Sequence, residues 1–145
     1  MKGATFLHTV TYSREVYYYE TDRMDCVHHS NYIRWFEEAR VHFMREMGFP
    51  YDKLEASGIV SPVLHADADY RAMCRFGEQV EIAAGIESYT GTRIGFFYAV
   101  TDKATGALRC QGRTLHCFIN ETGRPVSLRK ANPAYDARVR ELLED

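Results

Sequence analysis

Hydrophobic residues recur along one stretch of the chain with the period of an α-helix. Over residues 32–47, five apolar side chains are spaced by four, three, four and four residues, which places Tyr32, Phe36, Ala39, Phe43 and Met47 on one face. Gly48 and Pro50 follow and are typical of a helix end. Ser30 or Asn31 is expected to cap the start, because a short side-chain oxygen accepts a free backbone N–H. This stretch therefore predicts one substantial amphipathic helix.

The rest of the chain alternates with the two-residue period of half-buried strands. Strands are expected over residues 9–19, 64–71, 80–86, 94–100 and 108–119. Turns are expected at the glycines that separate them, namely Gly77, Gly91, Gly106 and Gly123. Strands joined by short turns pair antiparallel, and Pro133 introduces a C-terminal helix over residues 135–143. The pattern predicts an α+β domain with the main helix on the concave face of an antiparallel sheet.

Length and charge narrow the class of protein. The 145 residues fit a single domain spanning 1–145. Eighteen basic and twenty acidic residues give a net charge of −2, without the basic excess of nucleic-acid-binding proteins, so no nucleic acid partner is expected. No run approaches 18 apolar residues, so no membrane span is expected. The first eight residues lack the apolar core of a secretory signal.

The cysteines indicate the redox compartment. They are scattered, without CxxC spacing, at Cys26, Cys74, Cys110 and Cys117. In a chain of this length such cysteines are typical of free buried thiols, and not of a disulfide framework or a zinc site. A reducing cytoplasm is therefore the expected location.

Candidate chemistry gathers between the first strand and the main helix. Within residues 19–32, three carboxylates and two histidines occur close together: Glu20, Asp22, Asp25, His28 and His29. A helix start carries about half a positive charge and free N–H groups, which stabilise an oxyanion. A carboxylate folded back beside it would give an acyl-transfer or proton-transfer site. The alternative is a solvated, capped connection without catalytic function.

Other chemistries fit this segment less well. Adjacent histidines diverge in direction, and no HxxxH or HExxH spacing supplies a second ligand, so no metal is expected. There is no G-x-S-x-G motif for a serine nucleophile. Cys26 is a weak candidate for a nucleophile, because its position near the histidines is the only argument for that role.

The same segment resembles the hotdog-fold acyl-CoA thioesterases of the 4-hydroxybenzoyl-CoA thioesterase branch. The shared features are Thr-Asp at residues 21–22, His-Ser-Asn-Tyr at 29–32 and Trp-Phe-Glu-Glu-Ala-Arg at 35–40. Similar blocks follow at residues 70–82, 112–116 and 123–126. The resemblance extends from about residue 10 to residue 126, and several blocks in the right order are more specific than a single motif.

The resemblance implies a hotdog fold, in which a curved antiparallel sheet wraps a long central helix. Such proteins form homodimers by joining their sheets and often homotetramers, with active sites at the dimer interface. Asp22 matches the catalytic carboxylate, as nucleophile or general base. His29 matches the helix start, where a backbone N–H polarises the thioester carbonyl, and a histidine there is part of the site in the nearest bacterial subgroup. Asn31 and Tyr32 are the expected substrate-binding residues, and no cofactor is expected.

Asp25 departs from the family pattern, which commonly has glycine at this position. Glycine there implies an unusual backbone angle, and aspartate tolerates the left-handed conformation better than most residues.

Several questions about the substrate and the reaction stay open at this level. The acyl donor is acyl-CoA or an acyl carrier protein, and the candidate phosphate contacts are Arg71, Arg75, Arg124, Arg129 and Lys130. The alternatives to a thioesterase are a hotdog enoyl-thioester hydratase or dehydratase, a non-catalytic acyl-CoA-binding module, and a different α+β fold without thioester chemistry.

Overall fold

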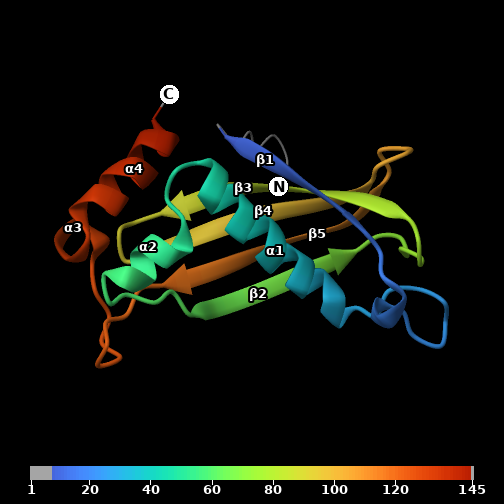
Figure 1. Cartoon of the computed structure of the whole chain (residues 1–145), viewed down its shortest axis with the longest axis horizontal. Helices are drawn as coiled ribbons and strands as arrows, with labels where there is room; N and C mark the ends of the chain where they lie inside the picture. The colour runs from blue at the N-terminus through green and yellow to red at the C-terminus, as the bar shows by residue number, and fades with distance from the viewer. Residues whose placement is uncertain (1–7, 145) are drawn as a thin grey trace.

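The structure, a computed structural model, describes residues 8–144 (Figure 1). Residues 1–7, on which the expectation of no secretory signal mainly rests, lie outside the described residues. The strands are β1 (Thr9–Glu15), β2 (Val63–Tyr70), β3 (Gln79–Tyr89), β4 (Arg93–Asp102) and β5 (Leu108–Cys117). The helices are the 3-10 turn η1 (Tyr18–Glu20), α1 (Ser30–Glu46), α2 (Tyr51–Ala56), α3 (Leu128–Ala131) and α4 (Pro133–Leu143).

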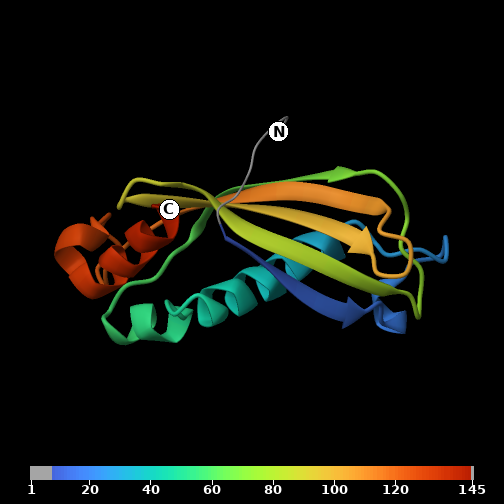
Figure 2. The same ribbon diagram turned by 90° about the horizontal axis from the view of Figure 1, so that it is seen from above.

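The strands form one antiparallel sheet in the order β1-β3-β4-β5-β2. This arrangement confirms the predicted α+β class and the predicted strands, apart from their exact ends. The loop between β3 and β4 turns at Gly91, and the loop between β4 and β5 turns at Gly106, each with positive φ as expected of turn glycines. Figure 2 shows α1 along one face of the sheet, and α1 contacts β1, β2, β3 and β4.

The apolar face predicted for the main helix packs into the core. In α1 the side chains of Tyr32, Phe36, Ala39 and Phe43 are buried, and Met47 after its end is half-buried. The helix ends where expected, since Gly48 has a φ of +84°. The Phe36 ring stacks on Tyr98 of β4, with ring centroids 4.5 Å apart. These contacts fix α1 against the centre of the sheet.

The first strand is shorter than the sequence pattern predicts. The expected strand over residues 9–19 was too long, because β1 ends at Glu15 and η1 follows. The Glu20 carboxylate accepts the backbone N–H of Tyr17 at 2.9 Å, which turns the chain out of the extended conformation. The three consecutive tyrosines therefore lie around a turn and not within a strand.

The expectation that residues 64–71 form a half-buried strand was wrong in its burial. Every residue of β2 is exposed except Ala68, which is half-buried. The physical reason is topological: β2 is an edge strand, and α1 packs mainly against β1 and β3. An exposed edge strand offers unpaired backbone N–H and C=O groups.

The cysteines are free, as predicted: Cys26, Cys74 and Cys110 are buried and Cys117 is half-buried. Across residues 8–144 no helix is long and apolar enough to cross a membrane.

Candidate active site

The segment between η1 and α1 folds back on itself as a tight turn. Thr21 and Val27 form an antiparallel bridge, and the N–H of Asp22 donates to the carbonyl of Cys26 at 2.9 Å. Asp25 near its tip has a φ of +61°, the one positive φ outside glycine in residues 8–144. The unusual backbone angle expected at Asp25 is thereby confirmed.

The Asp22 carboxylate is half-buried and is held by two donors from its own turn. Its Oδ1 accepts the N–H of Met24 at 2.8 Å and the thiol of Cys26 at 3.8 Å. Burial, and then the charge of Asp22, raises the pKa of the Cys26 thiol, which therefore stays protonated. Cys26 is thus a donor to Asp22 and not a thiolate nucleophile.

The start of α1 lacks the expected side-chain cap. The position before the helix is His29, so the prediction that Ser30 or Asn31 caps the start was wrong. The His28 Nδ1 instead accepts the N–H of Ser30 at 3.3 Å. The N–H groups of Asn31 and Tyr32 donate to the carbonyls of His28 and His29 at 2.9 and 3.3 Å. Within the described chain, the backbone N–H of His29 is the one N–H at this helix start that has no acceptor.

A cavity of about 360 Å³, which we call the His29 cavity, opens beside this helix start. Its lining residues are Val27, His29, Tyr32, Tyr70, Arg71, Ala72 and Met73. The Tyr70 hydroxyl donates to the carbonyl of His29 at 3.1 Å, and the Tyr70 ring packs edge-on against Tyr32 with centroids 5.3 Å apart. The cavity therefore lies between the start of α1 and the end of β2.

The structure brings two of the four predicted site residues, His29 and Tyr32, to this cavity. Asn31 does not line it, and its side-chain Nδ2 donates to the carbonyl of Glu20 at 3.0 Å. Asp22 does not line it either, but its turn ends at Val27, which does. Asp22 is therefore in the adjoining turn, and Asn31 joins η1 to α1.

Sequence analysis missed a buried ion pair that holds this segment in place. The Glu20 carboxylate accepts two hydrogen bonds from the Arg14 guanidinium, at 2.8 and 3.0 Å, and one from Trp35 Nε1 at 2.8 Å. Glu20 and Arg14 are only 4% and 7% exposed. The guanidinium lies 5.0 Å from the Tyr17 ring centroid and 4.8 Å from that of Trp35. The cluster joins β1, η1 and α1 beneath the Asp22 turn.

A signal for this cluster is present in the sequence. Arg14 falls on the same strand parity as Val10, Tyr12 and Val16, which is the inward-facing parity of β1. Because a buried charge needs a partner, an arginine at such a position indicates an acidic residue nearby in the fold.

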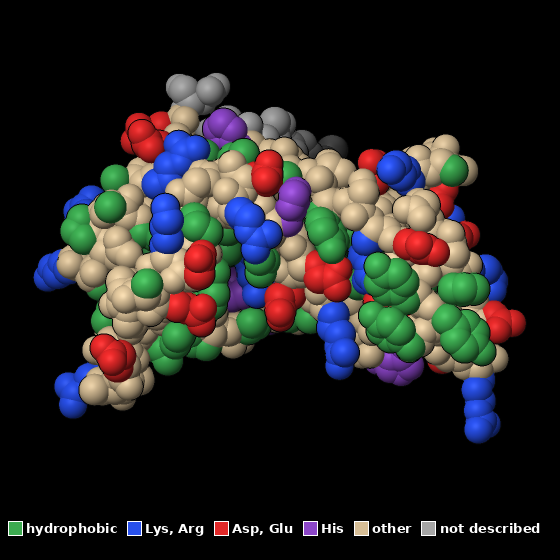
Figure 3. Space-filling model, in the orientation of Figure 1, with side chains coloured by type: hydrophobic (Ala, Val, Ile, Leu, Met, Phe, Trp, Pro, Cys, Tyr) green, Lys and Arg blue, Asp and Glu red, His purple; other side chains and the backbone are tan. Residues whose placement is uncertain are grey.

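Apolar side chains also gather on the surface beside the turn. Figure 3 shows them at the end of the molecule that carries η1. The exposed residues of this η1 patch are Tyr17, Tyr18, Tyr19, Met24 and Phe76. Such contiguous exposed apolar surface is typical of a contact site.

The two neighbouring histidines, His28 and His29, pack against each other. Their ring centroids lie 4.2 Å apart. Within residues 8–144, no three His, Cys, Asp or Glu side chains are grouped so that they would hold a metal ion.

Comparison with known proteins adds the family context. The sequence profile of the Thioesterase-like superfamily matches residues 8–140. YneP of Bacillus subtilis (strain 168), a candidate acyl-CoA thioesterase by its name, is 34% identical over 120 residues, which are 82% of this chain and 86% of YneP.

Solved structures share the fold. DHNA-CoA thioesterase from Staphylococcus aureus superimposes with a TM-score of 0.89 at 29% identity, over 93% of this chain and 91% of that chain. A hypothetical protein from Aquifex aeolicus superimposes with a TM-score of 0.80 at 33% identity, over 93% and 99%. The fold is thus of the hotdog thioesterase type.

Proposed function

The chain belongs to the Thioesterase-like superfamily, and from that premise we propose that it is an acyl-CoA thioesterase of the 4-hydroxybenzoyl-CoA thioesterase branch. It hydrolyses a fatty or aromatic acyl-CoA to a free acid and a thiol. Thioester hydrolysis is the activity that its relative and its structural neighbour carry in their names. The aromatic option is supported by the DHNA-CoA thioesterase, and an acyl carrier protein is the alternative acyl donor.

One observation carries the proposal. A carboxylate, Asp22, lies in the turn that ends at the cavity, and an N–H without an acceptor, that of His29, lies at the helix start that lines the same cavity. The positive end of α1, a helix of 17 residues, lies at the same place. A thioester is already an activated acyl group, so a polarised carbonyl and a delivered nucleophile are sufficient for its hydrolysis.

The carbonyl is polarised at the helix start. In the proposed complex the thioester oxygen accepts the backbone N–H of His29, while the His29 carbonyl accepts the hydroxyl of Tyr70. An oxyanion donor of this kind contributes about 2.7–4 kcal/mol to catalysis in characterised enzymes. Tyr32, whose ring lines the cavity, is the proposed contact for the substrate, and Asn31 supports the helix start.

Asp22 delivers the nucleophile. Its Oδ1 is occupied by the donors of Met24 and Cys26, so Oδ2 is the oxygen proposed to act. In one route Oδ2 attacks the carbonyl carbon, the thiolate leaves, and water then hydrolyses the mixed anhydride. In the other route Oδ2 takes a proton from water as the water oxygen attacks the carbonyl carbon, and the C–S bond of the tetrahedral intermediate then breaks to release the thiolate. In this proposal the imidazole of His29 protonates the departing thiolate.

In this proposal the part of the substrate that carries the acyl group, CoA or an acyl carrier protein, is bound outside the cavity. Arg71, which pairs with Asp69, lines the His29 cavity, and Arg75 donates to the carbonyl of Asp25 in the turn at 3.2 Å. We assign them to the phosphates of CoA. In an acyl carrier protein the same cations would meet acidic side chains of the carrier.

The active unit is a dimer or a tetramer. In this proposal two copies join through β2, the exposed edge of the sheet, and α1 is the central helix that each sheet wraps. Exposed Val63 and Leu64 on β2 support this contact, and the η1 patch supplies further apolar surface. A charge at the edge, Leu64→Lys, should convert the assembly to monomers in sedimentation velocity. A wild-type monomer would contradict this part.

The remaining context follows from composition. In this proposal residues 1–145 are one catalytic domain, and the four free cysteines support a reducing cytoplasm.

The proposal is tested with two matched variants in the same turn, Asp22→Asn and Asp25→Asn. With the acyl-CoA that wild type cleaves fastest, Asp22→Asn should lower kcat by at least about 100-fold, the lower range for acid–base catalysis. Asp25→Asn should stay within a few-fold of wild type, because asparagine also tolerates the positive φ. Equal activity of both variants and wild type would eliminate Asp22 as the catalytic group.

A further inference from the structure

The side chain of His28, which has no part in the proposed reaction, contacts the start of α1 in two ways. The first is a hydrogen bond: His28 Nδ1 accepts the backbone N–H of Ser30 at 3.3 Å and lies 2.8 Å from the Ser30 hydroxyl. Because a backbone N–H is a fixed donor, the proton of the neutral ring is assigned to Nε2. The bond spans two residues, as in the turns that asparagine and aspartate side chains form.

The second contact is between two rings. The His28 imidazole packs on that of His29, with centroids 4.2 Å apart and the ring planes inclined by 31°. The His29 ring also meets the Tyr70 ring edge-on, with centroids 6.2 Å apart. Exposed side chains otherwise change rotamer within nanoseconds. Two ring contacts therefore restrict the rotation of the His29 imidazole, although His29 is an exposed residue.

The backbone of His28 is anchored to the buried ion pair. Its N–H donates to the carbonyl of Glu20 at 2.9 Å, and its carbonyl accepts the N–H of Asn31 at 2.9 Å. The Glu20 carboxylate is in turn bound by Arg14 and Trp35. The His28 ring thus projects from a fixed backbone and provides a fixed surface for its neighbour.

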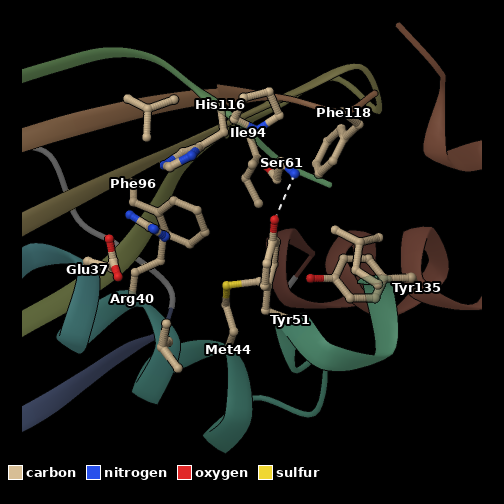
Figure 4. A pocket seen from close by; sticks show the side chains of 14 residues that line it. Glu37, Arg40, Met44, Tyr51, Ser61, Ile94, Phe96, His116, Phe118 and Tyr135 are labelled. Atoms are coloured by element: carbon tan, nitrogen blue, oxygen red, sulfur yellow. Dashed lines mark hydrogen bonds between the residues drawn. The ribbon is translucent and has the colours of Figure 1, made fainter. Parts of the chain in front are cut away.

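Histidines elsewhere in the described chain have different surroundings. His116 is 1% exposed, and Figure 4 shows its ring beside Phe96 in the wall of a second cavity, of about 300 Å³. Burial, and then the charge of Arg40, lowers the pKa of His116 to about 4, so this imidazole is neutral at pH 7. His42 packs on Tyr12, with ring centroids 5.5 Å apart. Within residues 8–144, the contact of one imidazole with another is found at the start of α1.

We propose that His28 is a positioning residue that orients the imidazole of His29 toward the departing sulfur. This inference rests on the proposed thioester hydrolysis. As the C–S bond breaks, its electron pair goes to sulfur, and sulfur takes a proton from the His29 imidazolium, which becomes a neutral imidazole. The free acid formed by hydrolysis releases the proton that restores the imidazolium. Because the N–H of Ser30 keeps His28 neutral, the stacked pair carries a single positive charge.

Two variants separate the two contacts of His28. His28→Asn keeps an acceptor for the N–H of Ser30 and removes the ring, whereas His28→Phe keeps a ring and removes the acceptor. Because His28 is exposed, both variants should fold. His42→Phe, which keeps a ring against Tyr12 on the same helix, is the matched control.

The kinetic test compares two thioesters of one acid in single turnovers, the CoA thioester and the phenyl thioester. An alkyl thiolate such as that of CoA takes up a proton near neutral pH. An aryl thiolate is a far weaker base and departs without one. His28→Asn should lower the rate with the CoA thioester about 10-fold and change the rate with the phenyl thioester less than about 2-fold. His28→Phe and His42→Phe should keep the wild-type ratio of the two rates.

A second measurement needs no turnover. In protein labelled with 13C at the histidine Cε1 atoms, the NMR order parameter of the His29 ring reports its rotation on the nanosecond scale. The order parameter should fall in His28→Asn and keep its wild-type value in His28→Phe and His42→Phe. If wild type releases no thiol and the order parameters follow this pattern, the hydrolysis fails and the orienting contact stands.

Two results would overturn the proposal. One is an unchanged order parameter of the His29 ring in His28→Asn. The other is an equal loss of rate with both thioesters in His28→Asn, because a merely structural change at the helix start would affect the two substrates alike.

Discussion

Tyr70, the last residue of β2, donates its hydroxyl to the backbone carbonyl of His29, 3.1 Å away. The contact joins the exposed edge of the sheet to the start of α1. It also fixes the peptide plane next to the N–H that we assign to the thioester carbonyl.

Tyr70→Phe removes this hydrogen bond while keeping the ring that packs on Tyr32. Because a hydrogen bond is worth about 0.5–1.5 kcal/mol net, kcat/KM should fall roughly 2- to 10-fold. Steady-state thiol release measures the effect. Tyr18→Phe, at an exposed tyrosine of the η1 patch, is the control and should behave as wild type. Identical kinetics for the two variants would remove Tyr70 from the positioning of His29.

Glu20→Gln removes the closer of the two carboxylates that face the buried Arg14 and leaves Glu38, whose Oε1 lies 3.6 Å from the Arg14 Nε. Removing one partner of a buried ion pair costs about 3–5 kcal/mol, so the free energy of unfolding should fall by that order. Urea denaturation followed by circular dichroism measures it. Glu15→Gln, at an exposed carboxylate on the same strand, should change stability by less than about 0.5 kcal/mol. Similar midpoints for both variants would contradict the role given to the Arg14–Glu20 pair.

Asp25 holds a positive φ that glycine adopts without strain. Asp25→Gly should therefore unfold at the same temperature as wild type or slightly higher. Asp25→Val, with a β-branched side chain in the left-handed region, should lose about 1–2 kcal/mol relative to the glycine variant. Thermal melts compare the two directly, and equal stability of Gly and Val at this position would refute the assigned backbone conformation.

His116 makes stability depend on pH. Its pKa is about 4 in the folded protein and near 6.5 in an unfolded chain. As the pH falls below about 6.5, the unfolded state takes up a proton that the folded state refuses, so folding stability is lost between about pH 6.5 and 4. The contribution has a slope of at most about 1.4 kcal/mol per pH unit. His116→Gln should flatten the fall in melting temperature over this window, and parallel curves would contradict the shift.

Most of the fold follows from local patterns that tertiary contacts then reinforce. The periodicity of Tyr32 to Phe43 predicted the buried face of α1, and the spacing of turns predicted the antiparallel sheet. Burial of β2 was not predictable, because alternation within a strand does not reveal whether a helix covers it. The short helices α2 and α3 were also missed, since one or two turns carry too little periodicity.

The site was predictable to a similar degree. The clustering of acids and histidines located the turn, and the resemblance singled out Asp22 and His29. The cap on α1 was not predictable, because the imidazole of His28 took the place of the expected Ser30 or Asn31 oxygen. Glu20 was seen only as one more carboxylate, since its partner Arg14 is brought to it by the fold.

The most direct test of the account is thiol release by the purified protein from aliphatic, aromatic and 2-enoyl acyl-CoAs, with loss of the enoyl absorbance recorded in parallel. The account predicts release of free CoA from at least one fatty or aromatic substrate, collapsing in Asp22→Asn. If thiol is released only from an acyl carrier protein thioester, the proposed hydrolysis stands and the acyl donor is the carrier protein instead of CoA. Two results would contradict thioester hydrolysis. One is loss of enoyl absorbance without release of thiol. The other is a folded protein that binds the CoA and acyl-carrier-protein thioesters but turns over neither.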